Sequence, residues 1–127
     1  MTIKNHYYNQ FVETSGGYAN MGTAPSFPLY RALGSMDASM LISRLAFWND
    51  KGSDDEGFIY KTIRDMKKET GLSRRRQEVA IRLCVKRGIL KVINKIPEFG
   101  GKRPVRHFLL ITDKINKLIL ANLKTHD

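Results

Sequence analysis

Two short helical patterns joined by a tight turn constrain the fold of this chain more than any other feature. Thr62, with an aspartate three residues later, is a capping-box variant that opens the first helix. Gly71 ends that helix, because glycine tolerates the positive φ of a tight turn. Leu72 can then enter the core, and Ser73 can cap a second helix that stops at Gly88. We therefore expect two short helices to meet at a fixed angle.

A longer helix is expected before this pair. Apolar residues at steps of three and four predict an amphipathic helix from Asp37, as its N-cap, to about residue 49. A polar loop over residues 51–57 and a short strand over residues 58–60 follow.

A β-hairpin is expected after the pair. Residues 89–96 and 105–111 are rich in β-branched and apolar residues, and the segment between them contains Gly100-Gly101 and two prolines. Thr112 can cap a last helix. Its apolar stripe either packs on the domain's own first helix or pairs with a second copy of the chain; its members are Ile115, Leu118, Ile119 and Leu123.

The length of 127 residues, 42% of them hydrophobic, suits one domain with one core. Residues 1–36 carry several glycines and prolines without a sustained period, which indicates an N-terminal arm. The arm is rich in aromatics, so part of it should pack on the domain or on a second subunit, and residues 27–33 can form a short helix. The expected class is α+β, mainly helical: an arm (1–36), a domain (37–111) and a C-terminal helix (112–127).

The net charge of +10 is concentrated in one segment. Residues 60–106 hold 15 Lys or Arg against 4 Asp or Glu, whereas residues 1–59 hold 4 against 6. A polyanion is the first candidate partner for such a segment, because cations that neutralise phosphates release condensed counterions.

Catalysis, metal binding and a cofactor have no support in the sequence. Cys84 stands alone, in a helical stretch where a small buried side chain is expected, and the three histidines are far apart. We find no paired carboxylates and no phosphate-binding glycine loop. No apolar run approaches the roughly 20 residues that span a bilayer, and the first residues lack a signal-peptide pattern. We expect a non-enzymatic cytoplasmic protein without a membrane partner.

The predicted order of helix, short strand, helix, turn, helix and hairpin resembles the winged helix-turn-helix domains of DNA-binding proteins. Several motifs resemble, more narrowly, the winged-helix modules of phage and plasmid replication proteins. These motifs are Leu33-Gly34, the series Ala38, Leu41, Leu45 and Trp48, and the segments 57–62, 70–73 and 87–90. The likeness covers residues 33 to about 111.

The resemblance implies that the recognition helix, residues 73–87, lies in the major groove and that the wing, residues 95–106, contacts the backbone or minor groove. Arg74 and Arg75 open the helix, where an arginine can bond guanine in two places and the helix dipole favours phosphate. With Ala80 and Cys84 inward, three cations face outward beside Glu78: Arg75, Arg82 and Lys86. Arg76 and Gln77 either face outward or turn, one or both, toward the second helix. Lys61, Arg64, Lys67 and Lys68 can flank the recognition helix as phosphate contacts.

In the wing, four cations bracket the Gly-Gly tip, and an arginine placed in a narrow minor groove is a known mode of shape readout. These residues are Lys95, Lys102, Arg103 and Arg106. Phe99 either stacks on DNA or folds back on the hairpin.

The expected function is that of a DNA-binding protein of a mobile element, a phage or plasmid, acting in replication or its control. Duplex DNA is the first partner, single-stranded DNA a second, and a homodimer or a replication-protein partner is expected beside them. A transcriptional repressor with the same surface and a winged-helix module for protein-protein interaction are the alternatives.

Overall fold

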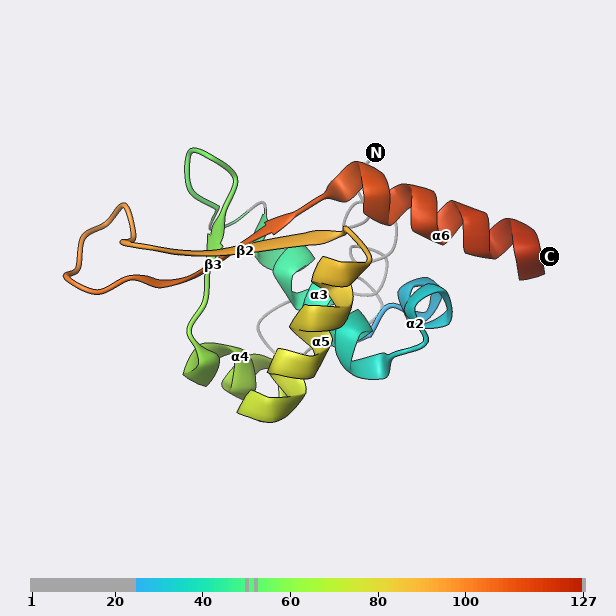
Figure 1. The fold of residues 1–127 in the computed structure, drawn as a ribbon, viewed down its shortest axis with the longest axis horizontal. Helices are drawn as coiled ribbons and strands as arrows, with labels where there is room; N and C mark the ends of the chain where they lie inside the picture. Colours follow the sequence, from blue (N-terminus) through green and yellow to red (C-terminus); the bar gives the residue numbers. More distant parts are fainter. Residues whose placement is uncertain (1–24, 50, 52, 127) are drawn as a thin grey trace.

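The computed structural model describes residues 25–49, 51 and 53–126 as one α+β unit that is mainly helical (Figure 1). Five helices and three strands follow one another in this part of the chain. They are α2 (Phe27–Leu33), α3 (Met36–Asn49), β1 (Ile59–Tyr60), α4 (Ile63–Thr70), α5 (Arg74–Lys86), β2 (Leu90–Lys95), β3 (Val105–Leu110) and α6 (Thr112–His126). The predicted fold class is confirmed at this level.

The strands form one small antiparallel sheet in the order β1-β3-β2. β2 and β3 pair along their length, from Leu90 opposite Leu110 to Lys95 opposite Val105. Two residues of β1 pair with the other edge of β3. The loop of the β2–β3 hairpin extends away from the helices, at the left of Figure 1.

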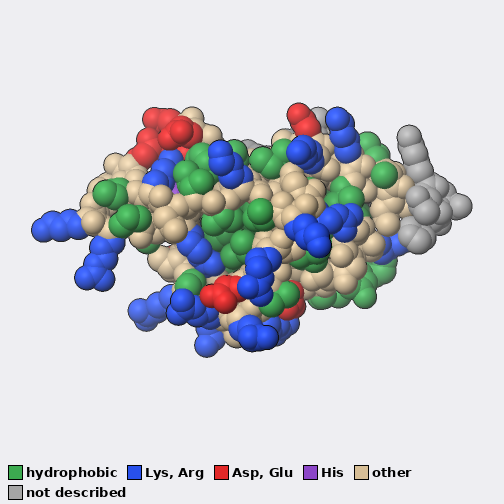
Figure 2. Space-filling view, viewed as in Figure 1, with side chains coloured by type: hydrophobic (Ala, Val, Ile, Leu, Met, Phe, Trp, Pro, Cys, Tyr) green, Lys and Arg blue, Asp and Glu red, His purple; other side chains and the backbone are tan. Residues whose placement is uncertain are grey.

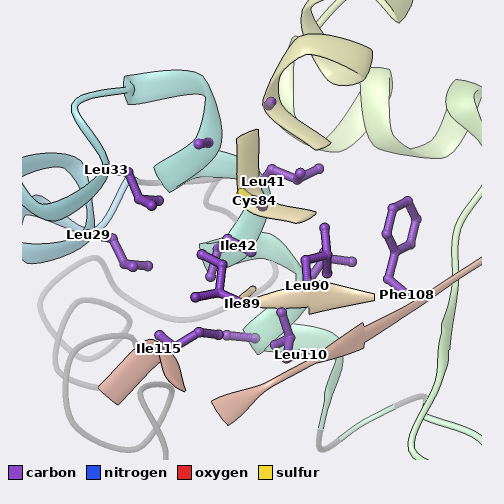
Figure 3. Packing of buried hydrophobic residues seen from close by; sticks show 14 of the residues in the cluster. Leu29, Leu33, Leu41, Ile42, Cys84, Ile89, Leu90, Phe108, Leu110 and Ile115 are labelled. Atoms are coloured by element: carbon purple, nitrogen blue, oxygen red, sulfur yellow. The ribbon is translucent and has the colours of Figure 1, made fainter. Parts of the chain in front are cut away.

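The core lies between the helices and one face of the sheet (Figure 3). Leu41, Ile42 and Leu45 of α3 are fully buried, and they pack with Cys84 of α5 and Phe108 of β3. Removing these side chains from water is the main stabilising contribution, at about 25 cal/mol per Å² of apolar surface. The packing fixes α5 and the sheet relative to each other.

The turn between α4 and α5 is built as the sequence predicts. Thr62 accepts a hydrogen bond from the Asp65 backbone N–H while the Asp65 carboxylate accepts one from the Thr62 N–H, which completes the capping box. Gly71 has φ 77°, Leu72 is fully buried, and the Ser73 hydroxyl accepts from the Arg76 N–H. These local contacts set where α5 begins.

The start of α3 differs from the prediction. Ser35, and not Asp37, holds the first turn: its hydroxyl accepts from the Ala38 N–H and its carbonyl from the Ser39 N–H. Asp37 lies inside the helix, and its carboxylate is thereby available to a distant partner.

The end of the expected arm is part of the domain. α2 forms over the predicted residues, and Leu29 and Leu33 are buried in the core. α2 lies beside α6, whose apolar stripe is used within the chain: Ile115 and Ile119 are buried, and Leu118 and Leu123 pack against the core. The aromatic residues expected in the arm before position 25 lie outside the described residues.

Candidate nucleic-acid interface

The face of α5 that points away from the core carries most of the predicted contact residues. Gln77, Ala80 and Cys84 are buried on the inner side. At about 100° per residue, the opposite side is a stripe of Arg75, Val79, Arg82 and Lys86, and all four are exposed. We call these four residues the α5 stripe. No ion pair joins its cations to a carboxylate of the described residues.

The three arginines that open α5 have different surroundings. Arg76 donates two hydrogen bonds to the Asp37 carboxylate of α3, at 2.9 and 2.7 Å. This contact lowers the pKa of Asp37 and raises that of Arg76. Arg74 forms a weaker, exposed pair with Glu78 at 3.3 Å. Arg75 points outward from the first turn and has no ion-pair partner among the described residues. Arg76, for which an outward and an inward position were expected, contacts the domain itself.

Gln77, expected either to face outward or to turn toward the second helix, is fully buried and acts as a positioning residue. Its side-chain nitrogen donates to the carbonyls of Ile63 and Leu72, at 3.0 and 2.9 Å, and its oxygen accepts from Arg106 at 2.8 Å. It therefore joins α5 to the start of α4, to the turn and to β3. Its spacing of three and seven residues from Ala80 and Cys84 was the available signal for an inward position.

Arg106 belongs to this internal junction. Its guanidinium lies 5.1 Å from the centre of the Phe108 ring and is half-buried. Burial lowers its pKa, and the charges of Glu78 and Arg74 act on it in opposite directions. Arg106 thus orients the hairpin against α5, and only part of its side chain reaches the surface.

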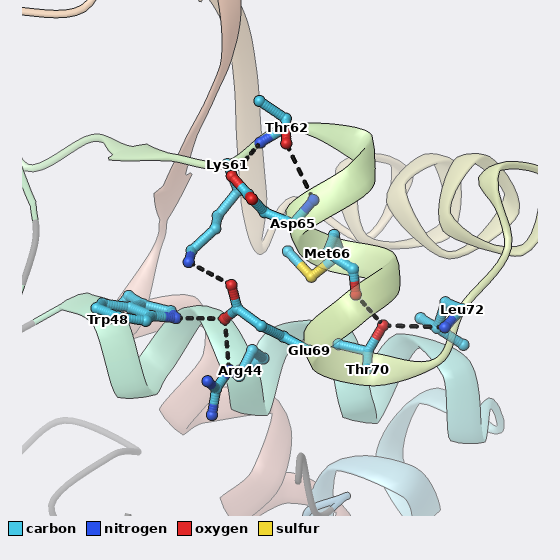
Figure 4. A network of polar contacts seen from close by, with 9 residues as sticks. All are labelled: Arg44, Trp48, Lys61, Thr62, Asp65, Met66, Glu69, Thr70 and Leu72. Atoms are coloured by element: carbon cyan, nitrogen blue, oxygen red, sulfur yellow. Dashed lines mark hydrogen bonds and ion pairs between the residues drawn. The ribbon is translucent and has the colours of Figure 1, made fainter. Parts of the chain in front are cut away.

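Lys61 is likewise part of the structure (Figure 4). Its ammonium lies 2.5 Å from the Glu69 carboxylate of α4 and 3.9 Å from the centre of the Trp48 ring. Glu69 also accepts from Arg44 at 2.7 Å and from the Trp48 indole at 2.6 Å. Burial alone would raise the pKa of Glu69, but these three donors outweigh it and lower the pKa. The expectation that Lys61 flanks the interface as a phosphate contact does not fit its burial.

Three other cations of α4 remain exposed at the surface. Arg64, Lys67 and Lys68 have no ion-pair partner among the residues that the structure describes. Lys67 and Lys68 lie in the last turn, where a positive charge also complements the helix dipole. Like the cations of the α5 stripe, they are candidates for phosphate contact.

The hairpin loop divides into an anchored base and an exposed tip. Lys95 pairs with Asp54 at 2.6 Å and with Glu56 at 3.1 Å. Burial would raise the pKa of Asp54, but the Lys95 bond and two backbone N–H donors lower it, and Asp54 in turn raises the pKa of Lys95. Lys102 and Arg103, beside Gly100 and Gly101, are exposed. Only this tip presents cations to a partner.

Phe99 packs against the sheet and remains largely exposed. Its ring packs edge-on against Tyr60 of β1, with 5.4 Å between the centres, yet the side chain is 77% exposed. Beside it lies an open hollow of about 330 Å³ that is lined mainly by aromatic side chains, and its charged lining residues are Asp54, Glu98 and Lys61. Its aromatic lining consists of Trp48, Phe58, Tyr60, Phe99 and His107.

Figure 2 shows where the charged side chains lie on one face of the molecule. Lys and Arg gather along the lower edge of the view, over α4 and the start of α5, and at the outer end of the hairpin, and others lie over the upper part of the molecule. The largest group of Asp and Glu is at the upper left, over the loop that precedes β1, and smaller groups lie among the cations of the lower edge. Positive charge therefore predominates along the lower edge and at the outer end of the hairpin.

Other chemistry finds no site in the part of the chain that is described. Burial raises the pKa of Cys84 to about 12, so its thiol stays protonated and unreactive. No group of three or more His, Cys, Asp or Glu side chains gathers there that could hold a metal ion. None of the described helices has the length and apolar character needed to cross a membrane.

No protein-family model matches the sequence, and no curated protein is significantly similar to it.

Proposed function

We propose that the chain is a winged helix-turn-helix protein that binds DNA, with α5 as the recognition helix and the β2–β3 hairpin as the wing. The order α3, β1, α4, α5, β2, β3 supports this assignment, because it is the order expected from the resemblance. α4 and α5 are joined by the short glycine turn of a helix-turn-helix motif.

One observation carries the proposal: the α5 stripe is exposed and cationic while the opposite face of the same helix is buried. A helix of about 10–12 Å diameter fits the major groove, which is about 12 Å wide. Arg75 lies in the first turn, where base-reading residues of such helices are found. A basic face that served only solubility would be expected to mix both signs of charge.

In this proposal, the exposed cations of α4 and of the hairpin tip act together with the α5 stripe. α4 and the hairpin tip carry further exposed cations, Lys67 and Lys68 on the helix and Lys102 and Arg103 at the tip, which would meet phosphates that flank the groove. The paired residues Lys61, Lys95 and Arg106 hold this arrangement in place.

Fluorescence anisotropy of the full chain on labelled duplex and single-stranded DNA, over a series of salt concentrations, tests the proposal. We expect the logarithm of the affinity to fall linearly with the logarithm of the salt concentration, by about 0.9 for each duplex phosphate contacted. An absence of binding to both DNAs at low salt would contradict it.

The biological role within this class is proposed from the resemblance of residues 33–111: replication of a phage or plasmid, or its control. A transcriptional repressor would use the same surface. Footprinting separates the two, because a repressor protects a short palindrome near a promoter, whereas a replication factor protects repeated or single-stranded origin DNA. Two-fold related sites would also support a homodimer.

The aromatic hollow favours a second candidate, a winged-helix module that binds a protein. Its lining is mainly aromatic and carries both signs of charge, which suits a partly apolar protein segment better than a phosphate backbone. A stable protein complex that is lost on Phe99→Ala, together with a lack of DNA affinity at low salt, would support this candidate over the first.

A further inference from the structure

Val79 is an apolar residue within an otherwise cationic stripe. It is 50% exposed and lies between Arg75 and Arg82 in the α5 sequence. At about 100° per residue, Arg75, Arg82 and Lys86 lie most directly opposite the buried Gln77, Ala80 and Cys84, and Val79 lies beside them, about 20° from Lys86. Val79 therefore shares the outward face of the helix with these three cations.

Neither folding nor phosphate binding accounts for valine at this position. The residue makes no contribution to the buried cluster, and β-branched side chains are weaker helix formers than the Lys, Arg or Glu around it. A valine also has no donor for a phosphate. A ligand that makes use of it must bring an apolar group to the middle of a cationic stripe.

DNA presents one such group in the major groove, the 5-methyl group of thymine. Phosphates that meet the surrounding cations would hold the groove against α5, where the short Val79 side chain can reach a base edge. Val79 lies four residues after Arg75, about 6 Å along the helix axis, which corresponds to about two base pairs at 3.4 Å each.

We infer that Val79 is a specificity-determining residue that contacts a thymine methyl group, about two base pairs from a guanine bonded by Arg75. This inference rests on the proposed function and adds to it the base composition of the target. It distinguishes α5 from a helix that binds duplex DNA by charge alone.

The experiment uses duplexes selected from a random library by the full chain, followed by replacement of each thymine with deoxyuridine, which removes only the methyl group. Affinities of wild type, Val79→Ala and Val85→Ala are measured at one salt concentration. Val85 is a matched control, because it is 46% exposed on α5 but lies on the flank of the stripe.

We expect one thymine at which deoxyuridine weakens the wild type about fourfold, the effect of one methyl group, and leaves Val79→Ala unchanged. Val85→Ala should keep the wild-type response. Arg75→Ala should lose its preference for guanine about two base pairs away.

Selected duplexes without a fixed thymine, neutral deoxyuridine at every position, or an equal response in Val79→Ala would each overturn the inference while DNA binding stands. If no duplex is bound at low salt, the proposed function fails and the inference fails with it. The two failures are thus separate results of the same experiment.

Discussion

Arg75 and Lys61 carry the same charge in the same basic segment, but their surroundings separate two regions of the molecule. Arg75 lies on the exposed α5 stripe, whereas Lys61 is buried against Glu69 and Trp48. Lys95 and Arg106 resemble Lys61, since Asp54 and Gln77 hold them beside the sheet. Lys61, Lys95 and Arg106 therefore help to build the fold, whereas the cations on the outer face of α5, on α4 and at the hairpin tip are exposed to a partner.

Because of this difference, the number of cations in a segment is larger than the number that a polyanion can reach. An exposed cation near a phosphate gains from counterion release, while a cation already paired inside the protein would first have to give up its partner. Substitutions in the two regions should accordingly affect different measurements.

The largest effect on stability is expected from Glu69→Ala. The change leaves Arg44, Lys61 and the Trp48 indole without their shared acceptor. Since the Glu69 side chain keeps 16% of its exposure, we expect the free energy of unfolding to fall by about 1–3 kcal/mol, below the 3–5 kcal/mol of a fully buried pair. Urea denaturation measures it. Glu78→Ala, which removes an exposed pair, is the matched control and should cost less than about 0.5 kcal/mol; equal losses would contradict the assignment.

The largest effect on DNA affinity outside α5 is expected from the double change Lys102→Ala and Arg103→Ala. Two lost phosphate contacts should lower the salt slope by about 1.8 without changing the unfolding free energy, since both side chains are exposed. Anisotropy titrations at several salt concentrations give the slope. An unchanged slope would show that the hairpin tip does not reach DNA.

A smaller, pH-dependent effect on the free energy of unfolding is expected from the Glu69 carboxylate. The pKa of Glu69 is lowered in the folded protein, so its contribution is complete above its ordinary pKa of 4.5 and is lost as the pH falls through the folded value. Unfolding free energies of wild type and Glu69→Gln should therefore converge as the pH drops below about 4.5. A constant difference down to pH 3 would argue against a charged Glu69 at the junction.

The smallest effect on DNA binding is expected from Arg76→Gln. Arg76 is held by Asp37, so its loss should change affinity less than about twofold and leave the salt slope unaltered. Arg75→Gln, one residue away, is the comparison and should lower the slope by about 0.9. Equal effects of the two changes would remove the distinction between paired and exposed arginines.

Local signals explain how much could be predicted. The capping box at Thr62, the turn at Gly71 and the cap at Ser73 depend on neighbours within a few residues, and all three form as expected. Whether a charged side chain is paired or exposed depends on the tertiary fold. Arg106 meets Gln77 across 29 residues, and Arg76 meets Asp37 across 39, so neither contact has a signature in the local pattern.

The start of α3 shows how a local helix cap and a tertiary contact depend on each other. Asp37 is a good N-cap by residue type, but Ser35 occupies that role two residues earlier. The helix then presents the Asp37 carboxylate to Arg76, and a residue expected to cap one helix instead joins two. Glu69 has the same character: nothing in its own helix indicates that it joins α3, α4 and the end of β1.

Charge reversal on the α5 stripe tests the account most directly. Arg75→Glu with Arg82→Glu is compared with Lys114→Glu with Lys117→Glu, an equal charge change at exposed positions on α6. The anisotropy of labelled duplex DNA at low salt is the measurement, with circular dichroism as the check on folding. We expect the first variant to lose at least about 100-fold in affinity while the second loses less than about tenfold. Equal losses in the two variants, or binding that survives the first, would contradict the assignment of α5 as the recognition helix.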